Sequence, residues 1–436
     1  MTHPALSLWL KLVGVFYPRV GVSFKERFPA VGPVIVVANH PNGLLDPLVL
    51  RLAIGAPFRF LGKSTFWDNP VGAWAMEAAG ALPVYRAQEA DTSKNEQTFA
   101  RCRALLADRG YLALFPEGTT HSRPELLPLK TGAARIALSA EGAADWKLGL
   151  RVVPVGLHFE DKAIFRSRVS VVVGEPLRVD RLRATAERDE RAAVEQLTEE
   201  IADALGQVVL RAANDELWRG LVAVATWTAV DGGADVAARD RRALALASRV
   251  REIAVEDPDR LASATAQVRR FVQLLEEIGV ADPLAVAAPD GPMSSRNLRL
   301  LLLIPPAAVG AALAWVPYRA VRPIAKRMAG GHADVEATYK MLIGIVLLPL
   351  TWLGWTAVAT WWFGPVGLLM LVLGPWSGLA ALQLEERLAL RWDALRGWWW
   401  ATDTRVQRAV QEQRAALCAL VEDALAPARA PDPDRG

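Results

Sequence analysis

Between Gly32 and Pro176 the chain alternates short apolar runs with longer stretches whose apolar positions recur at helical spacing. The apolar runs, rich in Val, Leu and Ile, are typical of buried strands: Val34–Ala38, Phe58–Leu61, Ala81–Val84, Tyr111–Phe115, Arg151–Leu157 and Val169–Val173. The helical stretches are Pro47–Ile54, Val71–Ala79, Ser93–Asp108 and Gly132–Ser139. This alternation predicts an α/β domain over residues 29–180, with a mixed, largely buried sheet flanked by helices.

Helical patterns lie on both sides of this domain. Aromatic and apolar residues of Pro4–Pro18 surround Lys11 over a length too short to span a bilayer. Within residues 1–28 we therefore expect a helix in the headgroup interface, with packing on a core as the alternative. Residues 181–295 are rich in Ala, Leu, Arg and Glu and predict a helical region with solvated charged faces. Its clearest helices are expected at Glu195–Ala213, Arg241–Ile253 and Arg260–Ile278.

Residues 296–385 predict a membrane region. Met341–Phe363 and Val366–Leu384 carry no charged residue, and each is long enough to cross a bilayer. The turn signal Gly364-Pro365 separates the two runs. We therefore expect a transmembrane helical hairpin.

A third apolar stretch, residues 300–316, is shorter, contains Pro305-Pro306 and has basic residues on both flanks. Because basic flanks favour the cytoplasmic side, we expect this stretch to enter the membrane and return, with a short span as the alternative. Together with the hairpin, it predicts an integral membrane protein whose active site and tail, residues 386–436, are cytoplasmic. The end of the tail, after Ala426, has the composition of a disordered segment.

Composition narrows the classes of function. The chain of 436 residues has a net charge of only +3, so no global field indicates nucleic acid as a partner. Cys102 and Cys418 lie far apart without ligand spacing, so we expect no disulfide framework, no metal site and a reducing compartment. Leu6–Phe16 is interrupted by Lys11 and does not fit a signal peptide.

Polar side chains suited to acid–base chemistry follow the first strand. His40 comes after Val34–Ala38 and Asn39, and Asp46 follows six positions later, directly before Pro47. An imidazole beside a carboxylate is a common general base. Two structural alternatives stay open: His40 as a satisfied polar residue at a strand end, and Asp46 as the cap of the following helix.

Three further clusters lie on or at the ends of later strands. Lys63, with a compact positive charge, and Arg86, with a planar guanidinium that can form two hydrogen bonds, both suit a phosphate. The alternative is that either side chain simply faces solvent. The run Glu117–His121 combines a glycine with hydroxyl groups that can cradle a polar headgroup, with a plain turn as the alternative. Val153–Gly156 is an apolar strand segment with a proline, expected at a sheet edge or bulge and able to line an acyl chain.

In this order the clusters resemble the four motifs of the glycerolipid acyltransferases, which include glycerol-3-phosphate and lysophosphatidate acyltransferases. The motifs are Asn39-His40 with Asp46, Gly62-Lys63 with Arg86, Phe115-Pro116-Glu117-Gly118 and Val153-Pro154-Val155-Gly156. The resemblance covers residues 30–180. Further runs, Leu126–Gly132, Asp334–Lys340 and Leu347–Trp352, are similar to the fungal-type acyltransferases that act on glycerol-3-phosphate and dihydroxyacetone phosphate.

Two departures from the family pattern matter. Five residues, Pro41–Leu45, separate the histidine from the aspartate, where the wider family usually has four; the fungal-type branch shares the longer spacing. The arginine usual at the end of the third motif is replaced by Thr120. A phosphate contact made by that arginine would have to fall to His121, Arg123 or Lys130.

The resemblance implies a role for each motif residue. His40 would be the general base, oriented by Asp46. The substrate-binding residues would be Asn39, Lys63, Arg86, Glu117, Gly118, Thr119, His121 and Lys130. Phe115, Pro116, Pro154 and Gly156 would line the acyl chain or serve the structure. No cofactor is implied, only acyl-CoA or acyl-carrier protein as co-substrate.

The predicted function is therefore acyl transfer from a thioester to glycerol-3-phosphate, with dihydroxyacetone phosphate as a second acceptor, in phospholipid synthesis at the membrane. Its partners would be the lipid bilayer, the glycerol-phosphate acceptor and the acyl donor. Two alternatives remain, a lysophosphatidate acyltransferase and a non-catalytic membrane scaffold. A thioesterase-like hydrolase lacks a placed nucleophile, because Cys102 falls within a predicted helix.

Overall fold

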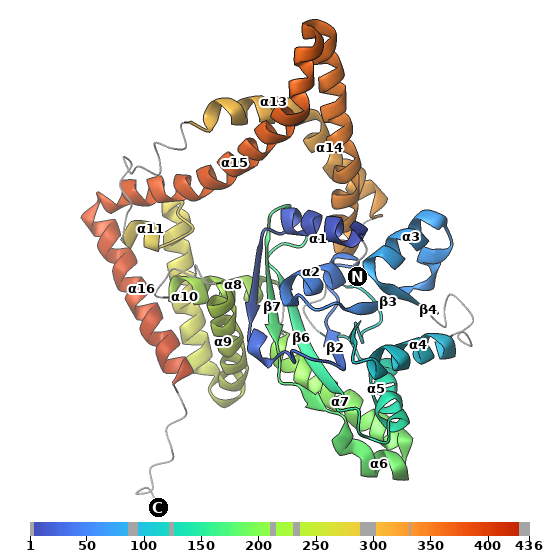
Figure 1. Cartoon of the computed structure of the whole chain (residues 1–436). Coiled ribbons are helices and arrows are strands. Elements are labelled where there is room, and N and C mark those ends of the chain that lie inside the picture. The colour runs from blue at the N-terminus through green and yellow to red at the C-terminus, as the bar shows by residue number, and fades with distance from the viewer. Residues whose placement is uncertain are drawn as a thin grey trace, which may run out of the picture. The chain divides into compact units, whose positions relative to one another are not determined.

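The computed structural model of the chain (Figure 1) describes residues 4–85, 95–121, 126–209, 215–229, 236–287, 302–330 and 333–426. The chain forms two compact units. The first comprises residues 1–219, 235–244 and 332–338, and the second comprises residues 220–234, 245–331 and 339–436. The predicted α/β domain thus lies within the first unit.

The first unit is built on an eight-stranded sheet. Its strands are β1 (Arg19–Ser23), β2 (Val34–Ala38), β3 (Arg59–Lys63), β4 (Ala81–Val84), β5 (Tyr111–Leu114), β6 (Arg151–Phe159), β7 (Arg168–Val173) and β8 (Leu177–Arg178). They lie in the order β1-β7-β6-β2-β5-β3-β4, with β8 beside β6. Strands β2 to β6 run parallel, whereas β7 and β8 run antiparallel to β6. The predicted mixed sheet is confirmed.

The structure contains all six predicted strands and two that the sequence pattern did not predict, β1 and β8. Strand β1 lies within residues 1–28, where only a helix was expected. The helix α1 (Pro4–Phe16) ends before it, and β1 then pairs in parallel with β7. This short strand contains Gly21 and owes its conformation to a partner far along the chain, so no local pattern marks it.

Helices cover both faces of this sheet (Figure 1). Those that follow the strands are α2 (Leu45–Ile54), α3 (Pro70–Ala79), α4 (Asn95–Ala107), α5 (Gly132–Ala143), α6 (Arg183–Arg188) and α7 (Glu190–Val208), with short turns η1 (Lys25–Arg27), η2 (Ser64–Trp67) and η4 (Asp180–Leu182). On one face Ile35 of β2 joins a core with Ile136 of α5 and Leu197 of α7. All five residues of β2 are 0% exposed, so the strand that precedes His40 is buried on both faces.

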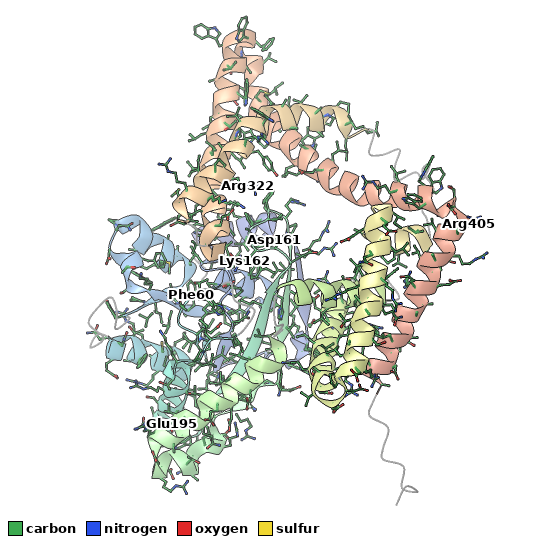
Figure 2. All side chains as sticks on the ribbon, turned by 180° about the vertical axis from the view of Figure 1, so that it is seen from behind. Phe60, Asp161, Lys162, Glu195, Arg322 and Arg405 are labelled. Atoms are coloured by element: carbon green, nitrogen blue, oxygen red, sulfur yellow. The ribbon has the colours of Figure 1, made fainter. Side chains whose placement is uncertain are left out.

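Helix α7 belongs with the sheet, although residues 181–295 were predicted as a separate helical region. Leu197, Ile201 and Leu205 on its inner face are buried in the core of the first unit. Its outer face is charged and solvated as predicted, and Glu195 lies on it (Figure 2). Glu195 forms an exposed ion pair with Arg191, with 3.0 Å between Arg191 Nε and Glu195 Oε1.

The helical region continues with α8 (Asp215–Trp227), α9 (Val236–Glu256), α10 (Pro258–Ile278) and α11 (Leu284–Ala287). In the second unit, α16 (Thr404–Leu425) packs along α10, where Arg260 Nη2 lies 2.6 Å from Asp423 Oδ2. The segment predicted as a tail therefore contributes a helix to this unit. Residues 427–436, predicted to be disordered, lie outside the described residues.

A helical hairpin forms the predicted membrane region (Figure 1). Helix α14 (Ala333–Phe363) turns through η5 (Gly364–Leu369) into α15 (Met370–Ala401), which confirms the predicted turn. Within the described residues, one stretch, Val335–Glu385, is long and apolar enough to cross a membrane, with 11% of its most apolar window buried. The two separate spans predicted from the sequence fall within this stretch.

Helix α13 (Ile304–Met328) replaces the short stretch predicted over residues 300–316. Pro305 and Pro306 lie in its first turn, where proline is tolerated, and so begin the helix instead of interrupting it. The helix packs on α15 at Gly310, where an added Cβ would overlap the Ser377 carbonyl oxygen. Close approach at small residues is typical of helix packing in membranes.

Candidate active site

The parallel strands bring the predicted polar clusters to one edge of the sheet. Strands β2, β5, β3 and β4 are neighbours and all end on the same side, so their carboxyl ends are adjacent. His40 follows β2, Glu117 follows β5, and Lys63 is the last residue of β3. This is where α/β folds usually place their sites.

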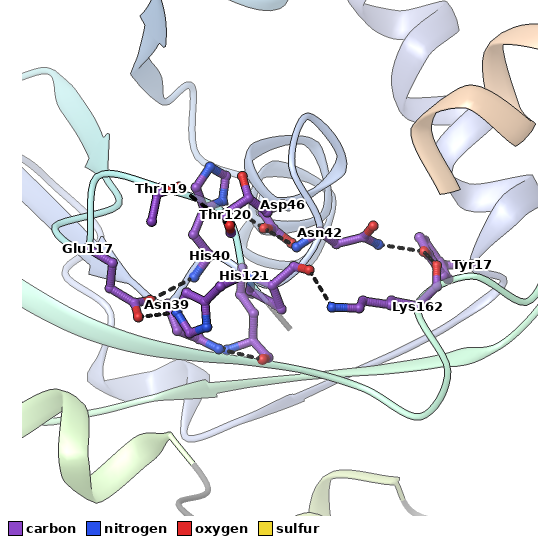
Figure 3. A network of polar contacts seen from close by, with 12 residues as sticks. Tyr17, Asn39, His40, Asn42, Asp46, Glu117, Thr119, Thr120, His121 and Lys162 are labelled. Carbon is purple, nitrogen blue, oxygen red and sulfur yellow. Dashed lines mark hydrogen bonds and ion pairs between the residues drawn. The ribbon is translucent and has the colours of Figure 1, made fainter. Parts of the chain in front are cut away.

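His40 and Asp46 form a hydrogen-bonded pair (Figure 3). His40 Nδ1 lies 2.8 Å from Asp46 Oδ2, and the Asp46 side chain is 0% exposed. Oδ2 also accepts a hydrogen bond of 2.8 Å from the backbone N–H of Asn42. The alternative in which Asp46 caps the helix is wrong, because α2 already begins at Leu45 and the Asp46 side chain is directed back to the preceding loop.

The His40 ring is held in one orientation. It stacks on Phe115, with ring centroids 4.1 Å apart and planes inclined by 16°. Because Nδ1 faces a carboxylate, it carries the proton of the neutral ring, and Nε2 keeps a lone pair. No residue in the described part of the chain hydrogen-bonds to Nε2. The ring is 17% exposed, so this nitrogen is available as a proton acceptor.

Burial raises the pKa of Asp46 above its ordinary value, although the hydrogen bond from His40 and the charge of its protonated ring act in the opposite direction. The surroundings of Asp46 therefore do not fully compensate the negative charge of its ionised carboxylate. A proton taken up by His40 would supply a positive charge 2.8 Å away. Asp46 is therefore placed to stabilise a positive charge on the His40 ring.

Glu117 braces this loop from the neighbouring strand. Its carboxylate is buried and accepts hydrogen bonds from the backbone N–H of His40 at 3.2 Å and of Leu127 at 2.9 Å. It also contacts the ring of His121. Both Glu117 and His121, predicted to bind substrate, are thus bonded within the protein.

The lysines and the glycine turn line the same edge. Gly118 has φ of +70°, a conformation that favours glycine, and an added Cβ would come within 2.6 Å of Lys130 Nζ. The Lys130 side chain therefore lies over the turn, next to the exposed Thr119. Lys63 is half-buried at the end of β3. Arg86 and Arg123 lie outside the described residues.

The remaining predicted residues are packed inside the protein. Asn39 uses its amide on the Leu157 backbone, accepting from the N–H at 2.7 Å and donating to the carbonyl at 2.9 Å. An added Cβ at Gly156 would overlap the Val208 carbonyl oxygen, which identifies it as a packing glycine beneath α7. Pro116 is also buried, and its carbonyl accepts a hydrogen bond from the backbone N–H of Lys130 at 2.8 Å.

Pro154 was predicted at a sheet edge or a bulge. It lies inside β6, which has neighbours on both sides. On one side of β6 the neighbouring strand is different before and after Pro154. Strand β8 pairs with Arg151 and Val152, and β7 pairs from Val155 onward. Pro154 falls between these two ladders, where a missing N–H is tolerated.

Three residues near the pair were not predicted: Tyr17, Asn42 and Lys162. Asn42 lies within the motif that contains His40, so its position in that loop was the available signal. Tyr17 figured only among the apolar and aromatic residues of the N-terminal segment. Lys162 follows β6 in a turn that no motif marks.

Residues 19–158, within the first unit, match the family model described as Acyltransferase. Relatives of the chain are enzymes of glycerolipid synthesis, which confirms the predicted resemblance. Glycerol-3-phosphate O-acyltransferase 2 of Saccharomyces cerevisiae is 39% identical over 120 residues, 27% of this chain and 16% of the relative. Glycerol-3-phosphate O-acyltransferase 1 of the same yeast is 26% identical over 287 residues, 59% of this chain and 36% of the relative.

A chloroplastic 1-acyl-sn-glycerol-3-phosphate acyltransferase of Arabidopsis thaliana is 29% identical over 156 residues, 36% of this chain and 40% of the relative. The chain thus spans less than half the length of each of these relatives. Among solved structures, the 1-acyl-sn-glycerophosphate acyltransferase PlsC of Thermotoga maritima is 20% identical. It covers 48% of this chain and 81% of its own, with a TM-score of 0.34.

Proposed function

We propose that the chain is a membrane-bound O-acyltransferase that transfers a fatty acyl group from an acyl thioester to glycerol-3-phosphate. Dihydroxyacetone phosphate would be a second acceptor. The observation that carries the proposal is the His40–Asp46 pair, with Nδ1 2.8 Å from Oδ2 and Nε2 unbonded among the described residues, inside the segment that matches the acyltransferase family model.

The chemistry needs only this pair and the two substrates. The glycerol hydroxyl oxygen attacks the thioester carbonyl carbon while His40 Nε2 accepts the hydroxyl proton. The tetrahedral intermediate then collapses, the carbon–sulfur bond breaks, and the leaving thiolate takes the proton back from the imidazolium. Asp46 stabilises the imidazolium between these two steps.

A hydrolase with a protein nucleophile fits the structure less well. Cys102 is 0% exposed inside α4, and burial raises the pKa of its thiol to about 12. A thiol with that pKa is almost entirely protonated at neutral pH, and the thiolate is the nucleophile. The substrate hydroxyl therefore remains the nucleophile of the proposal.

The choice of glycerol-3-phosphate as acceptor is supported by the two yeast relatives named for that activity, one of which matches over 59% of this chain. Lys63 and Lys130 would supply positive charge for the phosphate. Lysophosphatidate is the second candidate acceptor, because the Arabidopsis relative is named for its acylation.

The test offers purified protein a labelled acyl thioester, as acyl-CoA or acyl-carrier protein, with each acceptor in turn. We expect label in acylated glycerol-3-phosphate, and label in phosphatidate alone would overturn the choice of acceptor. The His40→Ala variant should lose about 10²–10⁴-fold in kcat and keep its melting temperature, because it lacks the base but not the fold. No transfer to either acceptor would favour a membrane scaffold.

Attachment to the membrane is supported by the exposed apolar hairpin. Trp361, Trp362 and Phe363, at its turn, are 87%, 76% and 72% exposed. Aromatic residues at such a turn suit the membrane interface. Helix α13 ends with exposed basic residues, Arg322 and Lys326 among them, which favour the cytoplasmic side. We propose an integral protein with a cytoplasmic active site; cysteine labelling in sealed vesicles tests this orientation.

A further inference from the structure

We propose that Tyr17, Asn42 and Lys162 are positioning residues that hold the His40–Asp46 pair in its reactive geometry. They do so through a closed ring of hydrogen bonds around the loop that follows His40. This inference rests on the proposed function. None of the three residues needs to touch the substrate.

The ring joins three separate segments of the first unit (Figure 3). The Tyr17 hydroxyl donates to the Lys162 carbonyl at 2.7 Å and accepts from Asn42 Nδ2 at 2.7 Å. Lys162 Nζ donates to the Pro41 carbonyl at 3.0 Å. The loop residues Pro41 and Asn42 are thereby held from α1 and from the turn after β6, and covalent bonds close the ring on both sides.

The ring is connected to His40, the proton acceptor, through two further hydrogen bonds that share one oxygen of Asp46. The backbone N–H of Asn42 donates to Asp46 Oδ2, the same oxygen that holds His40 Nδ1. A shift of Asn42 therefore moves the carboxylate, and the carboxylate sets the direction of the imidazole. Five residues separate the two side chains, so the ring has a length of loop backbone to fix between them.

Burial makes the ring rigid. Tyr17 and Asn42 are each 0% exposed, and the Tyr17 ring lies edge-on to Phe16 and Phe159, with centroids 4.8 Å and 5.3 Å away. Burial also raises the pKa of the Tyr17 phenol, so the hydroxyl stays protonated and can donate. Water cannot readily replace the Tyr17 hydroxyl at such a site, and its loss leaves both partners unpaired.

The N-terminal helix is thereby connected to the candidate active site. Tyr17 follows directly after α1, and α1 packs on α2, the helix that contains Asp46. Helix α1 contains no residue of the four motifs. The residue after its end nevertheless holds the loop that connects His40 to Asp46.

The experiment compares Tyr17→Phe with Tyr111→Phe. Both variants remove a hydroxyl that donates to a carbonyl. The Tyr17 hydroxyl also accepts from Asn42 Nδ2, whereas the Tyr111 hydroxyl donates to Ala30 at the opposite end of the sheet, at 2.9 Å. We expect Tyr17→Phe to lower kcat at least tenfold with little change in KM. Tyr111→Phe should leave both unchanged.

A second pair keeps the test valid if Tyr17→Phe folds poorly. Lys162→Met removes the donor to Pro41 and should lower kcat, and Lys162→Arg, which restores a donor, should recover most of it. If Tyr17→Phe and Lys162→Met have the kcat of the wild type, or lose only melting temperature, the inference is overturned while the proposed function stands. If the wild type shows no acyl transfer, the proposed function fails, and the inference with it.

Discussion

Replacing Asp46 with asparagine separates charge from geometry at the candidate active site. Both hydrogen bonds that the carboxylate accepts converge on Oδ2, from His40 Nδ1 and from the Asn42 N–H, each at 2.8 Å. The other oxygen, Oδ1, is buried and has no hydrogen-bond partner in the described part of the chain. An amide can place its oxygen at Oδ2 and its nitrogen at Oδ1, so the variant keeps both bonds and loses the charge.

We expect Asp46→Asn to lower kcat about tenfold, and by less than about 100-fold. A hydrogen bond to a charged group contributes ~1.5–3 kcal/mol, against ~0.5–1.5 kcal/mol for a neutral pair, so the imidazolium loses ~1–2 kcal/mol. Each 1.36 kcal/mol corresponds to a factor of about ten in rate. The tautomer of His40 is retained, because its Nδ1–H still meets an oxygen.

The same variant should gain stability relative to the wild type as pH rises. Because the pKa of Asp46 is raised in the folded protein, the unfolded chain releases this proton at lower pH than the folded one. The contribution of the carboxyl is complete below the unfolded pKa, ~3.9, and is lost as pH rises through the folded value. Asparagine has no such dependence.

The assay measures kcat with a labelled acyl thioester, and melting temperatures of both proteins in the same detergent between pH 4 and pH 8. The difference in melting temperature, variant minus wild type, should grow with pH. A difference that shrinks with pH would refute the burial argument. A loss near 10⁴-fold in kcat would refute the geometry, because it indicates the wrong tautomer of the histidine.

Two further substitutions test the packing around the site. Glu117→Gln presents an amide nitrogen to one of two backbone donors, from His40 or Leu127, so we expect a loss of roughly 1–3 kcal/mol in unfolding free energy; an unchanged melting temperature would contradict the bracing role. Gly156→Ala should cost ~1–3 kcal/mol through overpacking against α7. Its control, Gly132→Ala, has open space around the added methyl group and should be neutral or slightly stabilising. Urea titration of both glycine variants measures the change in unfolding free energy.

The parts of the fold that were predictable are those with a local signature. The buried strand Val34–Ala38 shows itself as a continuous apolar run, and its bounds agree with the structure. The hairpin turn at Gly364 was equally visible, because glycine and proline interrupt a long uncharged run. Strand β1 was not predictable, since a five-residue segment with a central glycine becomes a strand only through β7.

The candidate site was predictable in residue identity but less so in role. The spacing of His40 and Asp46 indicated the pair, whereas the helix start at Leu45, which directs the carboxylate to the histidine, depends on the loop conformation. In the sequence, the charge of Glu117 and its place beside a glycine and two threonines suggest a substrate ligand. Its burial against two backbone N–H groups arises from the adjacency of β2 and β5, which sequence order does not reveal.

The bridge between Asn39 and Leu157 bears on how the segment that contains His40 and Asp46 can be moved between proteins. The amide at the end of β2 is fixed by β6, and the His40 backbone is fixed by a carboxylate that follows β5. The loop of residues 39–46 therefore cannot keep its conformation without the strands on either side of β2. An engineer who grafts residues 39–46 onto another parallel sheet would have to carry over the ends of both flanking strands, or the loop would lose the contacts that define its shape.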